Sequence, residues 1–133
     1  MMSVATATAM LRPVDQAYLD ENDFVWDAVV DAGMVCVTIK EYSLAAGLTP
    51  TVNELLIRLP SGFPDVGPDM FWLAEPVARV DGVEIPAIQV TEVYLTRSWQ
   101  RWSRHIGAGW RPGVDDLRSY MAYVATCIQA AAK

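Results

Sequence analysis

The chain has 133 residues, a size typical of one domain with its own core. Its composition, 53% hydrophobic and 20% charged, excludes a disordered chain, and its net charge of −6 argues against an extended nucleic-acid-binding face. The apolar runs are far shorter than the roughly 20 residues of a membrane-spanning helix. No basic stretch precedes an apolar core at the start, so we expect a cytoplasmic protein without a secretory signal.

The beginning of the chain predicts a flexible end followed by a short helix. Residues 1–14 are expected to form a flexible N-terminus. Pro13 and the acidic residues after it nevertheless indicate a brief helix or turn in "LRPVDQAYLDEND". The β-rich runs 24–32 and 34–44 then flank Gly33, and this arrangement predicts a hairpin of two strands.

The middle of the chain predicts two further strands separated by prolines. Every second residue from 55 to 59 is apolar, which is typical of a strand with one buried face. Pro64 and Pro68 then exclude both a helix and a central strand, and a short strand resumes over residues 70–73. The segment "VARVDGVEIPAIQ" adds a predicted hairpin that turns at residues 81–82.

The C-terminal segment changes to a helical period. Its apolar residues recur every three or four positions, as on one face of a helix: Val114, Leu117, Met121, Val124 and Ile128. Pro112 lies near the expected start, and Asp115 and Asp116 occupy the first turn, where the helix dipole favours anions. The element order predicts an α+β fold, a four-stranded antiparallel meander with a C-terminal helix packed on one face.

The two cysteines of the chain lie in different predicted elements. Cys36 and Cys127 have no CxxC spacing, so we expect neither a disulfide framework nor a zinc site. Free cysteine is among the most buried residue types, and both are predicted to face the core. We expect no metal and no cofactor.

Three stretches carry a resemblance to a known family. The predicted third strand leads through Phe63-Pro64 and Pro68 into a fourth strand, "QRWSRH" follows, and "WRPG" at residues 110–113 precedes the C-terminal helix. Together they resemble the ubiquitin-conjugating (UBC or E2) superfamily, and in particular its prokaryotic E2-like family E. The resemblance covers residues 15–131 and implies a single UBC-like domain over residues 1–133. Its implied partners are a ubiquitin-like protein, often with tandem domains, and an activating enzyme.

The sequence departs from this superfamily at the catalytic position. A UBC enzyme carries its activated partner as a thioester, on a cysteine just ahead of the tryptophan of the superfamily's "WSP" motif. Here no cysteine occurs between Cys36 and Cys127, and the upstream "HPN" motif is also missing. His105 instead stands five residues before Trp110. The departure predicts either a protein without thioester chemistry or one with an unusual nucleophile.

Residues 97–118 collect the candidate site. This segment holds five of the ten basic residues and three of the five tryptophans. An imidazole at position 105 can accept an acyl group or act as a general base, and nearby guanidinium groups can stabilise negative charge or grip a carboxylate. The candidates are His105, Arg104 and Arg101 for catalysis, and Trp99, Trp102, Trp110 and Arg111 for binding.

Three functional interpretations remain open. The favoured one is a cysteine-less module, a pseudoenzyme that binds a ubiquitin-like protein, and the alternative is an atypical transferase that uses His105. Stacking of single-stranded nucleic acid on interleaved arginine and tryptophan is less favoured because the chain has no other basic patch. A purely structural role also stays open, with Trp99 and Trp102 as inward-facing helix anchors and the arginines paired with Asp115 and Asp116.

Overall fold

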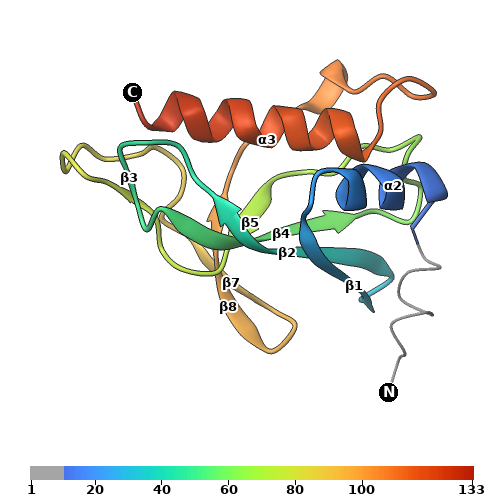
Figure 1. The fold of residues 1–133 in the computed structure, drawn as a ribbon, viewed down its shortest axis with the longest axis horizontal. Helices are drawn as coiled ribbons and strands as arrows, with labels where there is room; N and C mark the ends of the chain where they lie inside the picture. The colour runs from blue at the N-terminus through green and yellow to red at the C-terminus, as the bar shows by residue number, and fades with distance from the viewer. Residues whose placement is uncertain (1–10) are drawn as a thin grey trace.

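One antiparallel sheet organises residues 11–133, the part of the chain described by this computed structural model (Figure 1). The strands are β1 (Val25–Asp31), β2 (Met34–Ser43), β3 (Leu48–Thr49), β4 (Val52–Leu59), β5 (Phe71–Leu73), β6 (Ala78–Arg79), β7 (Thr91–Tyr94) and β8 (Arg97–Trp102). Six of them pair in the order β1-β2-β4-β5-β8-β7, and β3 pairs with β6 in a small second sheet. The helices are α2 (Pro13–Glu21), α3 (Leu117–Ala131) and the short 3-10 helix η1 (Gly107–Gly109).

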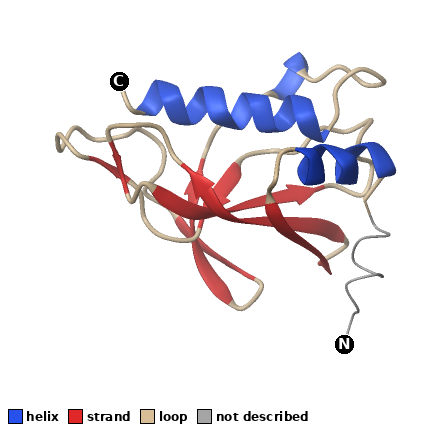
Figure 2. Cartoon of the chain, in the orientation of Figure 1, coloured by secondary structure: helices blue, strands red, loops and turns tan. Residues whose placement is uncertain are grey.

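Both α-helices lie on the same face of the six-stranded sheet (Figure 2). The main core fills the space between the helices and the sheet, and it includes Val37, Ile57 and Trp102, which are fully buried. A smaller cluster on the opposite face contains Cys36 and Trp99. Neighbouring residues of one strand thus enter different clusters, because side chains alternate across a sheet.

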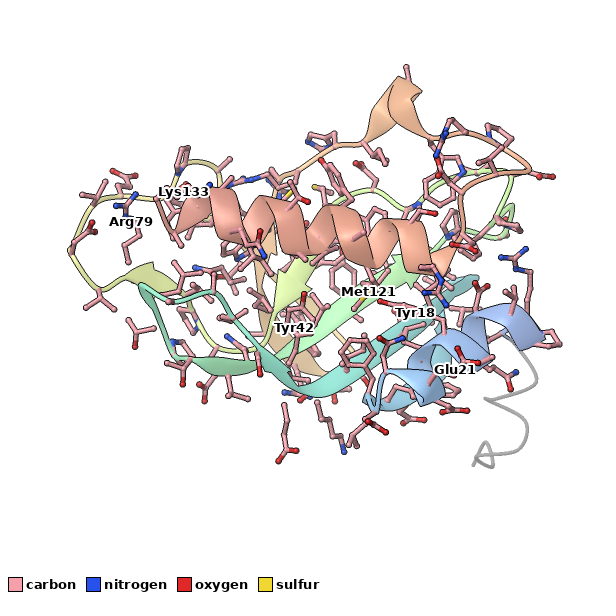
Figure 3. All side chains as sticks on the ribbon, turned by 45° about the horizontal axis from the view of Figure 1, so that its top comes forward. Tyr18, Glu21, Tyr42, Arg79, Met121 and Lys133 are labelled. Carbon is pink, nitrogen blue, oxygen red and sulfur yellow. The ribbon has the colours of Figure 1, made fainter. Side chains whose placement is uncertain are left out.

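Helix α3 is fixed at both ends. At its start, the buried Asp15 of α2 accepts a hydrogen bond from the backbone N–H of Leu117 at 3.2 Å, which satisfies one of the free N–H groups of a helix N-terminus. At its end, Arg79 of β6 donates to the carbonyl of Lys133, and Figure 3 shows these two residues side by side. The helix therefore spans the sheet from α2 to the small sheet of β3 and β6.

The α+β fold class is confirmed, since β1, β2, β4 and β5 form an antiparallel meander covered by the C-terminal helix. The helix begins later than the sequence pattern predicts, at Leu117. Val114 is 63% exposed outside it, and Asp116 is the N-cap, which accepts a hydrogen bond from the Ser119 N–H at 3.1 Å. This reciprocal cap with Ser119 fixes the start of the helix at Leu117, three residues beyond Val114.

One further expectation about the elements is wrong, and the sheet is larger than the predicted four-stranded meander. Residues 81–82 form a turn but no hairpin, because β6 pairs with β3 and the chain after the turn buries Ile85 and Ile88 against the core. The segment after it forms the hairpin β7–β8, which extends the sheet beyond the predicted four strands.

Residues 11–14 of the predicted flexible N-terminus lie in the described part of the chain. Leu11 is buried at 4% exposure, and Pro13 opens α2 at a position where proline favours a helix start. Residues 1–10 of that prediction lie outside the described residues.

Candidate functional site

The pairing of β5 with β8 brings together two loops that are far apart in the sequence. Phe71 lies opposite Trp102 in the ladder, so the chain before β5 runs beside the chain after β8. The Met70 N–H donates to the Arg104 carbonyl at 3.2 Å, and the buried Tyr120 hydroxyl donates to the Met70 carbonyl. Burial raises the pKa of Tyr120, which keeps this hydroxyl protonated as a donor. These bonds hold residues 69 and 105 next to each other.

His105 is paired with an acidic residue that the sequence patterns did not single out. Its Nδ1 lies 2.5 Å from Oδ1 of Asp69, which is 36 residues earlier in the chain. The side chains are 56% and 64% exposed, so the pair sits at the surface. Nε2 of the ring makes no hydrogen bond within residues 11–133. The pair therefore presents one occupied and one open ring nitrogen.

A groove of about 420 Å³ adjoins this pair. One wall is formed by residues 66–69 and the other by residues 105–107, and Trp110 also lines it. The indole is only 8% exposed, and its Nε1 donates to the Pro64 carbonyl at 2.8 Å. The groove is thus built on a ring that is fixed by both burial and a hydrogen bond.

Gly67 is required for the close approach of the chain to Trp110. A Cβ at this position would lie 2.5 Å from a carbon of the indole ring, closer than real Cβ contacts. Only glycine lets residues 66–69 run against the ring without a shift. The shape of the groove therefore depends on the absence of a side chain at Gly67.

The two arginines expected beside the candidate residue His105 point to other partners. Arg101 extends to Glu92 on β7, with 3.4 Å between Nη1 and Oε2, and its Nε donates to the Ser103 hydroxyl at 3.1 Å. Arg104 donates to the Pro86 carbonyl at 3.0 Å. Among the described residues, neither guanidinium hydrogen-bonds to His105. The structure therefore shows no direct contact between either guanidinium and the His105 ring.

Trp99 and Trp102 do not form the exposed arginine-aromatic surface that the sequence suggests. Both are fully buried, and they lie on opposite faces of the sheet because they are an odd number of residues apart in β8. The Trp102 ring stacks on Phe71 with 5.5 Å between the centroids. The idea of two helix anchors is also wrong, since both residues belong to a strand.

Arg111 follows the groove residue Trp110 in the chain and bonds to Asp115, just before the start of α3. Its Nη2 lies 3.1 Å from Oδ1 of Asp115, and its backbone N–H donates to Oδ2 at 2.8 Å. These bonds lower the pKa of Asp115 below its ordinary value. The Arg111 side chain stays 69% exposed, so part of its guanidinium faces solvent beside Trp110.

Neither cysteine lines the groove. Cys36 is 1% exposed on β2, in the cluster on the sheet face away from the helices, and burial raises the pKa of its thiol. Cys127 is half-buried on α3, where burial raises its pKa more than the Tyr123 hydroxyl and the Arg104 charge lower it. A raised pKa keeps a thiol protonated and therefore a weak nucleophile.

A family model named prokaryotic E2 family E matches residues 11–131, nearly the whole chain. The chain belongs to this family. The match confirms the resemblance and makes this E2-like protein a component of a bacterial ubiquitin-like system. No curated protein and no solved structure matches the chain significantly. Within residues 11–133, no helix has both the length and the apolar character that crossing a membrane requires.

Proposed function

We propose that this E2-like protein binds a ubiquitin-like partner in the groove beside Trp110 and does not carry that partner as a thioester. The observation that supports this is the composition of the groove, which contains His105 and Asp69 but no thiol. The sequence has only two cysteines, and both lie elsewhere in buried or half-buried positions. Without an accessible thiolate near the groove, a covalent carrier step has no nucleophile of the usual kind.

The groove suits an extended chain end with small residues. Gly67 and Gly107 contribute no side chains to its walls, and Trp110 and Ile106 offer apolar surface. Extended peptide segments without bulky side chains can lie flat against such a surface. An activating enzyme and a ubiquitin-like protein are the partners that family membership suggests in general.

Arg111, the residue after Trp110, offers a charged contact for the partner. A guanidinium has five N–H donors, and Asp115 accepts from only two of its nitrogens, Nε and Nη2. The remaining donors face solvent and can meet a carboxylate of the partner. This arrangement offers a cation next to an apolar groove.

The proposal predicts that a charge in the groove weakens binding of the cognate ubiquitin-like protein by about tenfold or more, equivalent to roughly 1.4 kcal/mol. The variant is Val66→Asp, because Val66 lines the groove and is 55% exposed, so the change leaves the core intact. Val93→Asp is the matched control, a 67% exposed valine on β7. Isothermal titration calorimetry measures both. Equal affinity of the two variants would contradict the groove as the binding site.

A further inference from the structure

A second pocket is formed by residues 77–79 and 82–89 together with Gln100 of β8, and we call it the β6 pocket. We propose that it binds a short segment of a partner protein, which inserts a large apolar side chain and places a lysine or arginine beside Glu84. The β6 pocket shares no lining residue with the groove beside Trp110. Binding here is therefore separate from the proposed function.

The β6 pocket has the size and the floor of a binding site. It lies in the segment drawn yellow in Figure 1, at the end of the molecule where α3 ends. Its volume of about 340 Å³ falls within the range of pockets that hold ligands. The buried side chains of Val77, Ile85 and Ile88 line it. Such a floor favours an apolar occupant, because binding removes apolar surface from water.

Two glutamines hold the walls of the β6 pocket in place. The Gln100 side chain accepts a hydrogen bond from the Val77 N–H at 2.9 Å and donates to the Val77 carbonyl at 3.3 Å. On the opposite loop, the Gln89 side chain accepts from the Ile88 N–H at 3.0 Å and donates to the Ile85 carbonyl at 2.7 Å. The pocket is thus formed before any partner arrives, which lowers the entropy cost of binding.

The unpaired charge at the β6 pocket is negative. Arg79 is neutralised by Asp81, with Nε and Nη2 at 3.0 and 2.6 Å from the two carboxylate oxygens. Glu84 accepts only from the uncharged amide of Gln89, at 3.3 Å, and no cation pairs with it within residues 11–133. A cation of the partner is the complement of this carboxylate.

Apolar side chains around the β6 pocket indicate that the occupant belongs to a protein. Val83 lines the pocket and is 54% exposed. Val80 and Val90, at the two ends of the same loop, are 71% and 44% exposed and lie outside the lining. A small molecule in the pocket would leave these side chains in water, whereas a protein segment anchored there can cover them as well.

The test selects peptides on the full chain. A library of random heptapeptides, displayed in many copies on each phage particle, is selected on the immobilised protein and sequenced. We expect peptides with a large apolar residue next to lysine or arginine to be enriched by about a hundredfold over empty support, the low end of the gain from multivalent binding. No enrichment would overturn the proposal, and enrichment without a basic residue would overturn the role of Glu84.

Two pairs of variants separate the β6 pocket from general attraction to an acidic protein. Val83→Glu should abolish the enrichment, and Val25→Glu, at a 56% exposed position on β1, should retain it. Glu84→Lys should select aspartate or glutamate beside the apolar residue. Glu75→Lys makes the same charge change at an exposed position outside the pocket and should still select basic peptides. Equal selection by both members of either pair would contradict the proposal.

A titration locates the site directly. A synthetic copy of the most enriched heptapeptide is added to ¹⁵N-labelled protein, and ¹H–¹⁵N spectra are recorded. We expect shifts at residues 77–90 and at Gln100. Shifts confined to the groove beside Trp110 would overturn the β6 pocket as the site. Val83→Glu should bind the ubiquitin-like protein as the wild type does, so failure of this site and failure of the proposed function are measured separately.

Discussion

Trp110→Ala is expected to lower the free energy of unfolding by about 3 to 5 kcal/mol, as large-to-small changes of buried aromatic residues do. The indole is 8% exposed and contacts the rings of Phe63 and Tyr120, with centroids 5.9 and 6.4 Å away. Its removal leaves a cavity and deprives the Pro64 carbonyl of its donor. Urea denaturation followed by circular dichroism measures the change.

Trp26→Ala is the matched control for this variant. Trp26 is only partly buried on the edge strand β1, and its Nε1 bonds to the carboxylate of Asp20 at the surface. We expect a smaller loss of unfolding free energy, about 1 to 2 kcal/mol, because the Trp26 ring is partly exposed and water can take the place of its surface contacts. A cost for Trp110→Ala no larger than that for Trp26→Ala would mean that Trp110 is not the fixed base of the groove.

Gly67→Ala is expected to destabilise the protein by about 1 to 3 kcal/mol and to weaken partner binding at the same time. The new Cβ would lie 2.5 Å from the Trp110 ring, so either the ring or residues 66–69 must move. Either movement changes the walls of the groove. Urea denaturation gives the stability, and calorimetry with the ubiquitin-like protein gives the affinity.

Gly109→Ala is the control, because a Cβ there would make only an ordinary 3.6 Å contact with Ile106. Neither glycine has the positive φ that would itself penalise alanine. The two variants therefore differ from each other in the steric clash of the new Cβ and not in backbone strain. Equal stability and equal affinity of the two variants would contradict the close packing of Gly67 against Trp110.

The elements that sequence analysis predicted correctly are those with a local pattern. The period of the apolar residues marks α3, and the alternation in β4 marks its buried face, because each depends only on neighbouring residues. The strand β8 lacks this signal. Trp99 and Trp102 bury on opposite faces of the sheet, so its apolar residues do not alternate with polar ones. The local pattern at residues 81–82 predicted the turn correctly, but β6, the strand before the turn, pairs with the distant strand β3 and not with the residues after the turn.

In the candidate site too, the residues with a local signal were predicted and those that depend on distant pairing were not. His105 and Trp110 stood out from the sequence as the only histidine and part of a recognisable motif, and the structure places both at one groove. Asp69 had no such signal, because its relation to His105 arises from the pairing of β5 with β8. The contacts of Arg101 and Arg104 depend in the same way on Glu92 and on the carbonyl of Pro86, and no spacing rule indicates these distant partners.

The central claim, binding of a ubiquitin-like partner without a thioester, is tested most directly by mass spectrometry of the charging reaction. The chain is mixed with its ubiquitin-like protein, the activating enzyme and ATP, and its intact mass is measured without reductant. We predict no covalent adduct on the wild type, while native mass spectra of the same mixture contain the non-covalent complex. A reductant-sensitive adduct that disappears in a Cys36→Ala/Cys127→Ala variant would contradict the claim.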